Sequence, residues 1–186
     1  MQDPTPAPLA PEPLEASSFA PFGQVLAFDP ANAYAVNDGQ ALRSDLPARF
    51  EPAGNGGAPT LAMFRARRQS LPAAIRFVER HPHSSQAFLP LAPRGFQLVV
   101  APDSANGEPD LARARAFFGR PGQGVNYRRG VWHAPIAATD DDTDFLMLIW
   151  ERGLADDTVV HRLARPLIVR ARPTHGAPFE EVPHGA

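Results

Sequence analysis

The chain has 186 residues, of which 44% are hydrophobic and 20% are charged, and its formal net charge is −2. This composition is typical of one globular domain and argues against a disordered chain. No long basic run is present, so nucleic acid is not an expected partner. No apolar stretch reaches the ~18 residues that a membrane-spanning helix needs, so no membrane partner is expected.

The residue types that are missing restrict the chemistry. The sequence contains no cysteine, which excludes disulfides, thiolate nucleophiles and cysteine zinc sites. All 18 basic residues are arginine, so a Schiff base through a lysine is excluded, and an anion must be held by arginine, histidine or backbone N–H groups. Residues 1–13 are rich in proline and lack the pattern of a secretory signal. We therefore expect a cytoplasmic protein.

Apolar runs of strand length recur along the chain, separated by many of its 22 prolines and 14 glycines. These runs span residues 24–28, 61–65, 71–81, 85–91, 96–101, 131–138, 145–152, 158–163 and 167–171. Many short strands between turn residues are typical of an all-β sandwich or barrel.

One or two short helices are expected in addition to the strands. The clearest lies within 110–118, where Asp110 is a suitable N-cap and Gly119 follows the run. Residues 32–57 are polar and are expected to form a long loop with short structured pieces. The sequence thus predicts a single domain over residues 14–172, a proline-rich N-terminal tail over 1–13 and a C-terminal tail over 173–186.

Residues 71–81 can be interpreted as a strand or as a helix, and the two alternatives predict different sites. In a strand, Glu79 and His81 share one face with the apolar residues that precede them. In a helix, Glu79 would instead lie near His83. The strand is favoured because its apolar face becomes polar just before Pro82, as expected where a barrel strand reaches a cavity.

Two segments carry donor groups with a spacing that resembles the metal motifs of cupin barrels. In the first motif, His-X-His is followed by four residues and Glu; here Glu79, His81 and Gln86 take those places. The second motif ends in Gly, two residues and His, which residues 130–133 match with His133 as the fourth donor. Such oxygen and imidazole donors suit a divalent ion such as Ni, Mn, Fe or Zn. The alternative is that Glu79 pairs with an arginine and that the histidines cap strand ends.

Two further residues could act at such a site. His83 could bind a metal beside His81, but Pro82 is expected to start a turn that leaves His83 at the surface. Arg65 ends an apolar strand, so its guanidinium could hold a substrate carboxylate with two hydrogen bonds. A surface ion pair is the equal alternative for Arg65.

The remaining candidates could line a substrate cavity. Asn37 and Asp38 lie in the polar loop, where the Asp38-Gly39 pair favours a turn. Tyr127 and Trp132 are aromatic residues within a glycine-rich segment, and they are expected in the core or in a cavity wall.

Taken in chain order, these motifs resemble the ureidoglycolate lyase family from about residue 9 to residue 153. The motifs that carry the resemblance include Asn37-Asp38-Gly39, Glu79-Arg80-His81-Pro82, Gly122-Gln123-Gly124-Val125-Asn126-Tyr127, Gly130-Val131-Trp132-His133 and Asp144-Phe145-Leu146. The resemblance implies a cupin-like antiparallel β-barrel, a homodimer, and cleavage of ureidoglycolate to glyoxylate and urea in allantoin and purine catabolism. A divalent metal has been associated with this family.

The resemblance also implies roles for the candidate residues. The metal or polar centre would be formed by Glu79, His81, Gln86 and His133. Of these, Glu79, His81 and His133 would be catalytic, and His133 is the candidate base if no metal binds. The substrate would be held by Arg65, Asn37 and Asp38 and enclosed by Tyr127 and Trp132.

The chain departs from the family in three places. Ala134 stands where a second histidine usually follows His133, and Ser44 stands where the early loop usually has a histidine. Residues 150–153 read Trp-Glu-Arg-Gly in place of Asp-Arg-Gly-Gly. The alternative function is therefore a cupin-like lyase or binding protein for another small hydroxy acid or carbinolamine.

Overall fold

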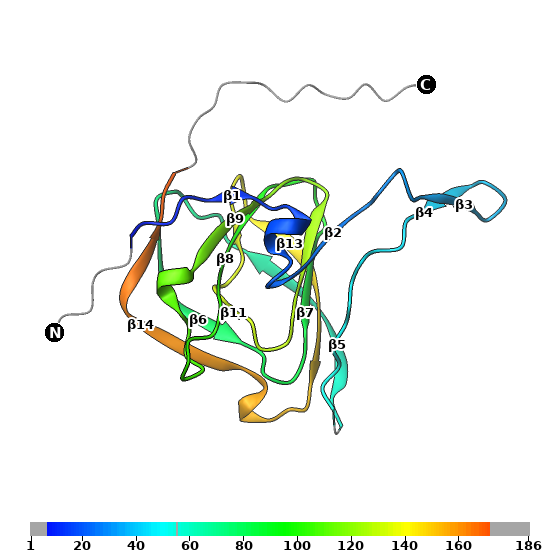
Figure 1. The fold of residues 1–186 in the computed structure, drawn as a ribbon. Helices are drawn as coiled ribbons and strands as arrows, with labels where there is room; N and C mark the ends of the chain where they lie inside the picture. The colour runs from blue at the N-terminus through cyan, green and yellow to red at the C-terminus, as the bar shows by residue number, and fades with distance from the viewer. Residues whose placement is uncertain (1–6, 55, 172–186) are drawn as a thin grey trace.

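The computed structural model describes residues 7–54 and 56–171, and most of the ordered elements are strands (Figure 1). A seven-stranded sheet runs in the order β1 (Glu12–Pro13), β9 (Arg115–Gly119), β8 (Phe96–Ala101), β11 (Trp132–His133), β6 (Ala73–Arg80) and β14 (Val159–Val169), and β12 (Ala137–Ala138) also pairs with β8. Of these pairs only β1–β9 is parallel.

A five-stranded antiparallel sheet faces the larger one. Its order is β2 (Gly23–Ala27), β10 (Gln123–Tyr127), β7 (Gln86–Pro90), β13 (Thr143–Glu151) and β5 (Ala58–Ala66). A separate hairpin, β3 (Tyr34–Val36) and β4 (Ala41–Arg43), extends away from the two sheets (Figure 1). The short helices are α1 (Ala16–Phe19) and the 3₁₀ turns η1 (Leu111–Arg113) and η2 (Ala155–Asp157).

Aromatic rings fill the space between the two sheets. Phe145 of the smaller sheet contacts Phe96 of the larger sheet edge-on, with ring centroids 5.7 Å apart. Phe88 packs edge-on against Phe145 at 6.1 Å, and all three side chains are buried. A second apolar cluster, which includes Trp132 and Val99, is separate from this core. The larger sheet therefore has apolar contacts on both faces, and the inter-sheet core is the place where residues from both sheets meet.

The all-β prediction is confirmed, but the strands do not form one closed barrel. In the described part of the chain, the pairing leaves two separate sheets and the small hairpin. The strand alternative for residues 71–81 is correct, because β6 occupies residues Ala73–Arg80. No helix of the described chain is long and apolar enough to cross a membrane.

The helix expected within 110–118 is wrong. Only the 3₁₀ turn η1 forms there, and β9 follows at once. Pairing with β8 over residues 115–119 decides the outcome, because it buries Phe117 in the inter-sheet core. Burial in a sheet has overridden the local helix signal at Asp110.

Other boundaries also differ from the expected ones. The run 131–138 is divided between β11 and β12, whereas the runs 158–163 and 167–171 belong to one strand, β14, with an irregularity between Arg162 and Leu167. Within the expected N-terminal tail, Glu12–Pro13 pairs with β9 and Leu9 bridges to Val169. The expected C-terminal tail over 173–186 lies outside the described residues.

Candidate active site

Three of the four predicted donors converge between the sheets. One ligand atom from each of Glu79, His81 and His133 lies within 4.8 Å of the others. His133 of β11 is directly opposite Glu79 of β6, so both side chains project from the same face of the sheet. His81 follows Glu79 by two residues and shares that face through strand alternation. The register of one antiparallel pair thus joins segments more than fifty residues apart.

The two imidazole rings are held in matching orientations. The Nδ1 atom of His81 lies 3.0 Å from the Asp157 carbonyl oxygen, and Nδ1 of His133 lies 2.9 Å from the Val131 carbonyl oxygen. A carbonyl oxygen only accepts hydrogen bonds, so each Nδ1 carries the proton. In the neutral form of each ring the Nε2 atom then carries the free lone pair, and both Nε2 atoms are buried without a hydrogen-bond partner.

The facing sheet adds two polar groups to this region. The ring of Tyr127 stacks on His133, with centroids 4.3 Å apart and planes 10° apart. Gln86 is paired directly with Tyr127 across β7 and β10, which puts both side chains on the inner face of the smaller sheet. The Tyr127 hydroxyl and the side-chain amide oxygen of Gln86 are both buried and have no hydrogen-bond partner. The Gln86 amide nitrogen donates to the Met147 sulfur at 3.4 Å.

Burial determines the protonation of the site. It lowers the pKa of His133 from 6.5 to about 3, with help from nearby His81, while the hydrogen bond to Val131 acts in the opposite direction. His133 is thus neutral near pH 7, and its 3.8 Å approach to Glu79 is not an ion pair there. Burial also raises the pKa of Glu79, partly offset by His81.

Tyr127 stays protonated at any physiological pH. Burial raises the pKa of its phenol well above the usual range, and the charge of Glu79 raises it further. Its hydroxyl is therefore available as a hydrogen-bond donor. Together the cluster offers the neutral imidazole of His133, the imidazole of His81, a carboxyl group of raised pKa and a phenol O–H.

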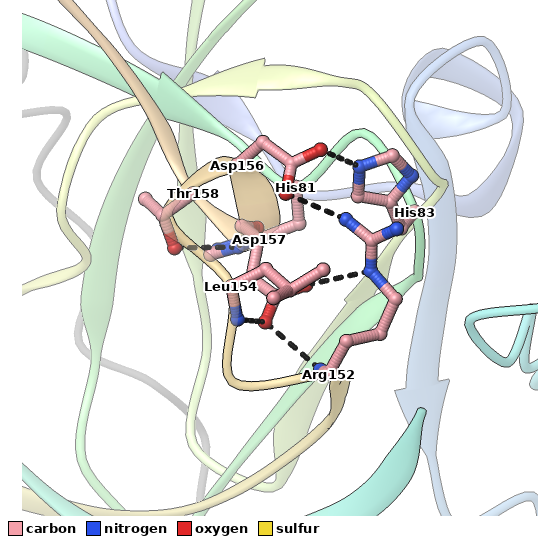
Figure 2. A network of polar contacts seen from close by, with 7 residues as sticks. All are labelled: His81, His83, Arg152, Leu154, Asp156, Asp157 and Thr158. Atoms are coloured by element: carbon pink, nitrogen blue, oxygen red, sulfur yellow. Dashed lines mark hydrogen bonds and ion pairs between the residues drawn. The ribbon is translucent and has the colours of Figure 1, made fainter. Parts of the chain in front are cut away.

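A polar network that the sequence did not indicate lies behind His81 (Figure 2). The carboxylate of Asp157 accepts hydrogen bonds from the backbone N–H groups of Arg152 and Leu154 at 2.8 and 2.9 Å. Burial alone would raise the pKa of Asp157, but these hydrogen bonds and the Arg152 guanidinium outweigh it and lower the pKa. No motif or spacing links these residues to His81, because the contact to the ring is made by a backbone carbonyl.

His83 lies outside the cluster, as expected from the turn at Pro82. Its Nε2 atom is 2.9 Å from the Asp156 carboxylate, and its side chain is 33% exposed. That contact ties His83 to the network of Figure 2 rather than to the convergent donors.

The structure does not bring the other predicted substrate-binding residues to the cluster. Arg65 forms a bidentate ion pair with Asp144 at 2.6 and 2.8 Å, and its side chain is 65% exposed. Its strand neighbour Phe64 packs on buried Phe88, so alternation directs Arg65 outward. The expectation that Arg65 reaches the cavity is therefore not met.

Asn37, Asp38 and Trp132 are also placed away from the donors. Asn37 and Asp38 form the left-handed turn of the projecting hairpin, with φ of 55° and 56° (Figure 1). Trp132 precedes His133 in β11 and therefore faces the opposite side of the sheet, where the Arg80 guanidinium lies 4.4 Å from its ring centroid.

A cavity of about 540 Å³ is lined by residues other than the convergent donors. Gly130 and Val131 line it, so it lies beside the turn whose carbonyl holds the Nδ1 side of His133. Arg115 also lines it, but its guanidinium is already bound by both carboxylate oxygens of Glu12 at 2.7 Å. The unpartnered atoms that could meet a substrate belong to the cluster, not to this cavity.

Comparison with known proteins agrees with the motifs. Residues 6–170 match the model of a family described as ureidoglycolate lyase. A ureidoglycolate lyase of Rhizobium etli is 41% identical over 158 residues, which cover 85% of this chain and 93% of that protein. A ureidoglycolate lyase of Burkholderia cepacia is 40% identical over 142 residues, covering 76% of this chain and 78% of the relative.

Solved structures resemble the chain more distantly. A dTDP sugar isomerase from Desulfovibrio desulfuricans G20 gives a TM-score of 0.45 at 16% identity, over 77% of this chain and 84% of the other. That likeness is too low to assign a fold family.

Proposed function

Since the chain belongs to the ureidoglycolate lyase family, we propose that it is a lyase that cleaves ureidoglycolate to glyoxylate and urea. The observation that carries the proposal is the convergence of Glu79, His81 and His133, with both Nε2 atoms buried and unpartnered. We further propose that it acts in the cytoplasm, in allantoin and purine catabolism.

The reaction needs one proton to move and no water to be consumed. Ureidoglycolate is a carbinolamine, whose central carbon carries a hydroxyl, a urea nitrogen and a carboxylate. Removal of the hydroxyl proton lets a carbonyl form while the carbon–nitrogen bond breaks. The departing nitrogen then takes up a proton, which gives glyoxylate and urea. A single group that accepts the first proton and returns it to nitrogen is sufficient.

In the metal-free site Glu79 is suited to carry that proton. Its carboxyl group is partly buried, and burial raises its pKa toward the range in which a group both accepts and releases a proton. His133 is less suited to act as a base, because a pKa of about 3 makes it a weak proton acceptor. The Tyr127 hydroxyl and the Gln86 amide oxygen, both buried and unpartnered, would hold the polar groups of the substrate.

The donor set fits a divalent metal ion. Two imidazoles with unpartnered Nε2 atoms and one carboxylate are ligands that Ni, Mn, Fe or Zn accept. Each ring is fixed at Nδ1 by a carbonyl, which is how metal-binding histidines are commonly oriented. We propose that Glu79, His81 and His133 hold such an ion, with Gln86 as a fourth donor. Bound there, a divalent ion lowers the pKa of a coordinated hydroxyl and orients the substrate.

We also propose that the chain forms a homodimer with a cupin-like arrangement of its sheets. The projecting hairpin exposes Leu42, and the edge strand β5 exposes Leu61 and Met63, each by more than 60%. Exposed apolar side chains on an unpaired strand edge favour association. Asn37 and Asp38 would then bind substrate in the active site of the partner subunit, because their hairpin points away from the sheets of its own chain.

The second candidate function is cleavage or binding of another small hydroxy acid or carbinolamine. It is favoured by Ala134, a buried residue beside His133 at a position where the family usually has histidine. The test is to measure release of urea and glyoxylate from ureidoglycolate by the purified chain, and then from a panel of hydroxy-acid ureides. Turnover of ureidoglycolate that exceeds turnover of every other ureide supports the main proposal. A preference for another ureide supports the second.

A further inference from the structure

The orientation of His81 depends on a turn that lies outside the donor cluster. The Nδ1 atom of His81 is 3.0 Å from the Asp157 carbonyl oxygen and 3.2 Å from the Thr158 hydroxyl (Figure 2). His81 itself is only 6% exposed. The Asp157 carbonyl therefore decides which ring nitrogen carries the proton, and hence which one presents its lone pair to the cluster.

The turn that presents this carbonyl is closed by the side chain of the same residue. The Asp157 carboxylate accepts the N–H groups of Arg152 and Leu154, and it accepts the Arg152 Nε–H at 3.1 Å. The Asp157 N–H in turn donates to the Leu154 carbonyl at 3.0 Å. This carboxylate is 9% exposed, so its hydrogen bonds are little weakened by solvent.

A second contact ties the turn to the segment that follows His81. The Arg152 guanidinium donates to Asp156 at 2.7 Å, and the other Asp156 oxygen lies 2.9 Å from Nε2 of His83. Asp156 is 59% exposed, so this outer contact contributes little. The buried hydrogen bonds of the Asp157 carboxylate therefore contribute most of the stabilisation of this turn.

We propose that Asp157 is a positioning residue: its carboxylate fixes the turn whose carbonyl holds His81 as the Nδ1–H tautomer, with Nε2 directed into the cluster. Arg152, the residue that follows β13, supports it. This inference deepens the proposed function and rests on it only for the activity readout. Outer partners of site histidines commonly change affinity or activity by about 10- to 100-fold when they are removed.

The test compares Asp157→Ala with Asp142→Ala in the full chain. Asp142 is a matched control, because its carboxylate also accepts a backbone N–H, that of Arg68, and an arginine side chain, that of Arg67, far from the cluster. The first readout is the His81 tautomer, measured by histidine nitrogen NMR on chelator-treated protein. The second is turnover of ureidoglycolate, separated into kcat and KM.

We expect Asp157→Ala to give a mixture of His81 tautomers, an unchanged His133 signal and a kcat about 10- to 100-fold lower, with little change in KM. Asp157→Asn should lie between this variant and the wild type, because one side-chain oxygen remains to accept a backbone N–H. Asp142→Ala should leave both readouts as in the wild type. His83→Ala should leave the tautomer unchanged.

A folded Asp157→Ala protein that retains the Nδ1–H tautomer of His81 overturns the proposal, whatever its activity. If Asp157→Ala does not fold, the same NMR measurement on Asp157→Asn and Arg152→Gln decides between the two results. Failure of the proposed function would be distinguishable, because the wild type would then release no urea while the tautomer measurement would still give its answer.

Discussion

The ring of Tyr127 lies parallel to the imidazole of His133, with the two centroids 4.3 Å apart. One residue comes from the smaller sheet and the other from the larger, so this stack is a direct contact between the two sheets at the candidate active site. It also buries the hydroxyl of Tyr127 without a hydrogen-bond partner. A buried hydroxyl without a partner costs stability, and the proposed role of Tyr127 in holding substrate would supply the missing partner.

Replacement of Tyr127 by Phe should separate stability from activity. The ring and its stack on His133 remain, while the buried, unpartnered hydroxyl is lost. We expect the free energy of unfolding to stay equal or rise by about 1 kcal/mol, while KM for the substrate increases. Urea denaturation and steady-state kinetics on the same preparation measure both. A loss of stability with unchanged KM would show that the hydroxyl has a structural role instead.

The low pKa of His133 predicts a pH dependence of stability. In the folded chain this pKa is about 3, against 6.5 as its ordinary value, so between these limits the unfolded chain binds more protons. The free energy of unfolding should therefore fall as the pH drops from 6.5 toward 3, with a slope of up to about 1.4 kcal/mol per pH unit from this group. Above pH 6.5 this contribution should be constant.

His133→Gln tests that slope. Glutamine does not titrate, so the variant should show a flatter dependence than the wild type in denaturant unfolding of metal-free protein. His161→Gln is the control, because this histidine contacts Trp132 on the other side of the sheet and should leave the slope intact. Equal slopes in the wild type and His133→Gln would contradict the assigned burial of His133.

Divalent ions should bind the chain with one ion per cluster. We expect Ni²⁺, Mn²⁺, Fe²⁺ or Zn²⁺ to raise the melting temperature of chelator-treated protein, because an ion that binds only the folded state stabilises it. His81→Ala should abolish the effect and His161→Ala should not. Isothermal titration calorimetry gives the stoichiometry, and equal binding by wild type and His81→Ala would refute the metal assignment.

The dimer prediction concerns the projecting hairpin and the edge strand. Light scattering at micromolar concentration should give twice the 20.1 kDa mass of the chain. Leu42→Glu combined with Leu61→Glu should shift the protein toward the monomer, because charges replace two exposed apolar side chains. The matched control is Leu154→Glu, at an exposed leucine on neither element. A monomeric wild type would rule the prediction out.

Strand positions could be predicted from the sequence where apolar runs end at turn residues, as in β8, which matches its expected bounds. The sequence does not predict the strand β10 (Gln123–Tyr127), because the glycines of this segment permit tight turns. The structure gives another reason for the glycine: a side-chain carbon at Gly124 would lie 2.5 Å from the Phe88 carbonyl oxygen of the neighbouring strand. Such a requirement comes from sheet pairing, which the local sequence does not record.

The convergence of Glu79, His81 and His133 could be predicted because strand alternation and motif spacing are properties of the sequence. The position of Arg65 could not, because it depends on which face of β5 is buried, and that is decided by Phe64 packing on Phe88. Asp157 could not be found either, since it acts on His81 through a backbone carbonyl that any residue type possesses.

We propose that Glu79, His81 and His133 form one catalytic centre for ureidoglycolate cleavage. The most direct test is the rate of urea release from ureidoglycolate by the wild type, His133→Ala and His161→Ala, each confirmed as folded by circular dichroism. We expect release by the wild type and His161→Ala, and a kcat/KM at least about 100-fold lower for folded His133→Ala. A folded His133→Ala protein that releases urea at the wild-type rate would contradict it.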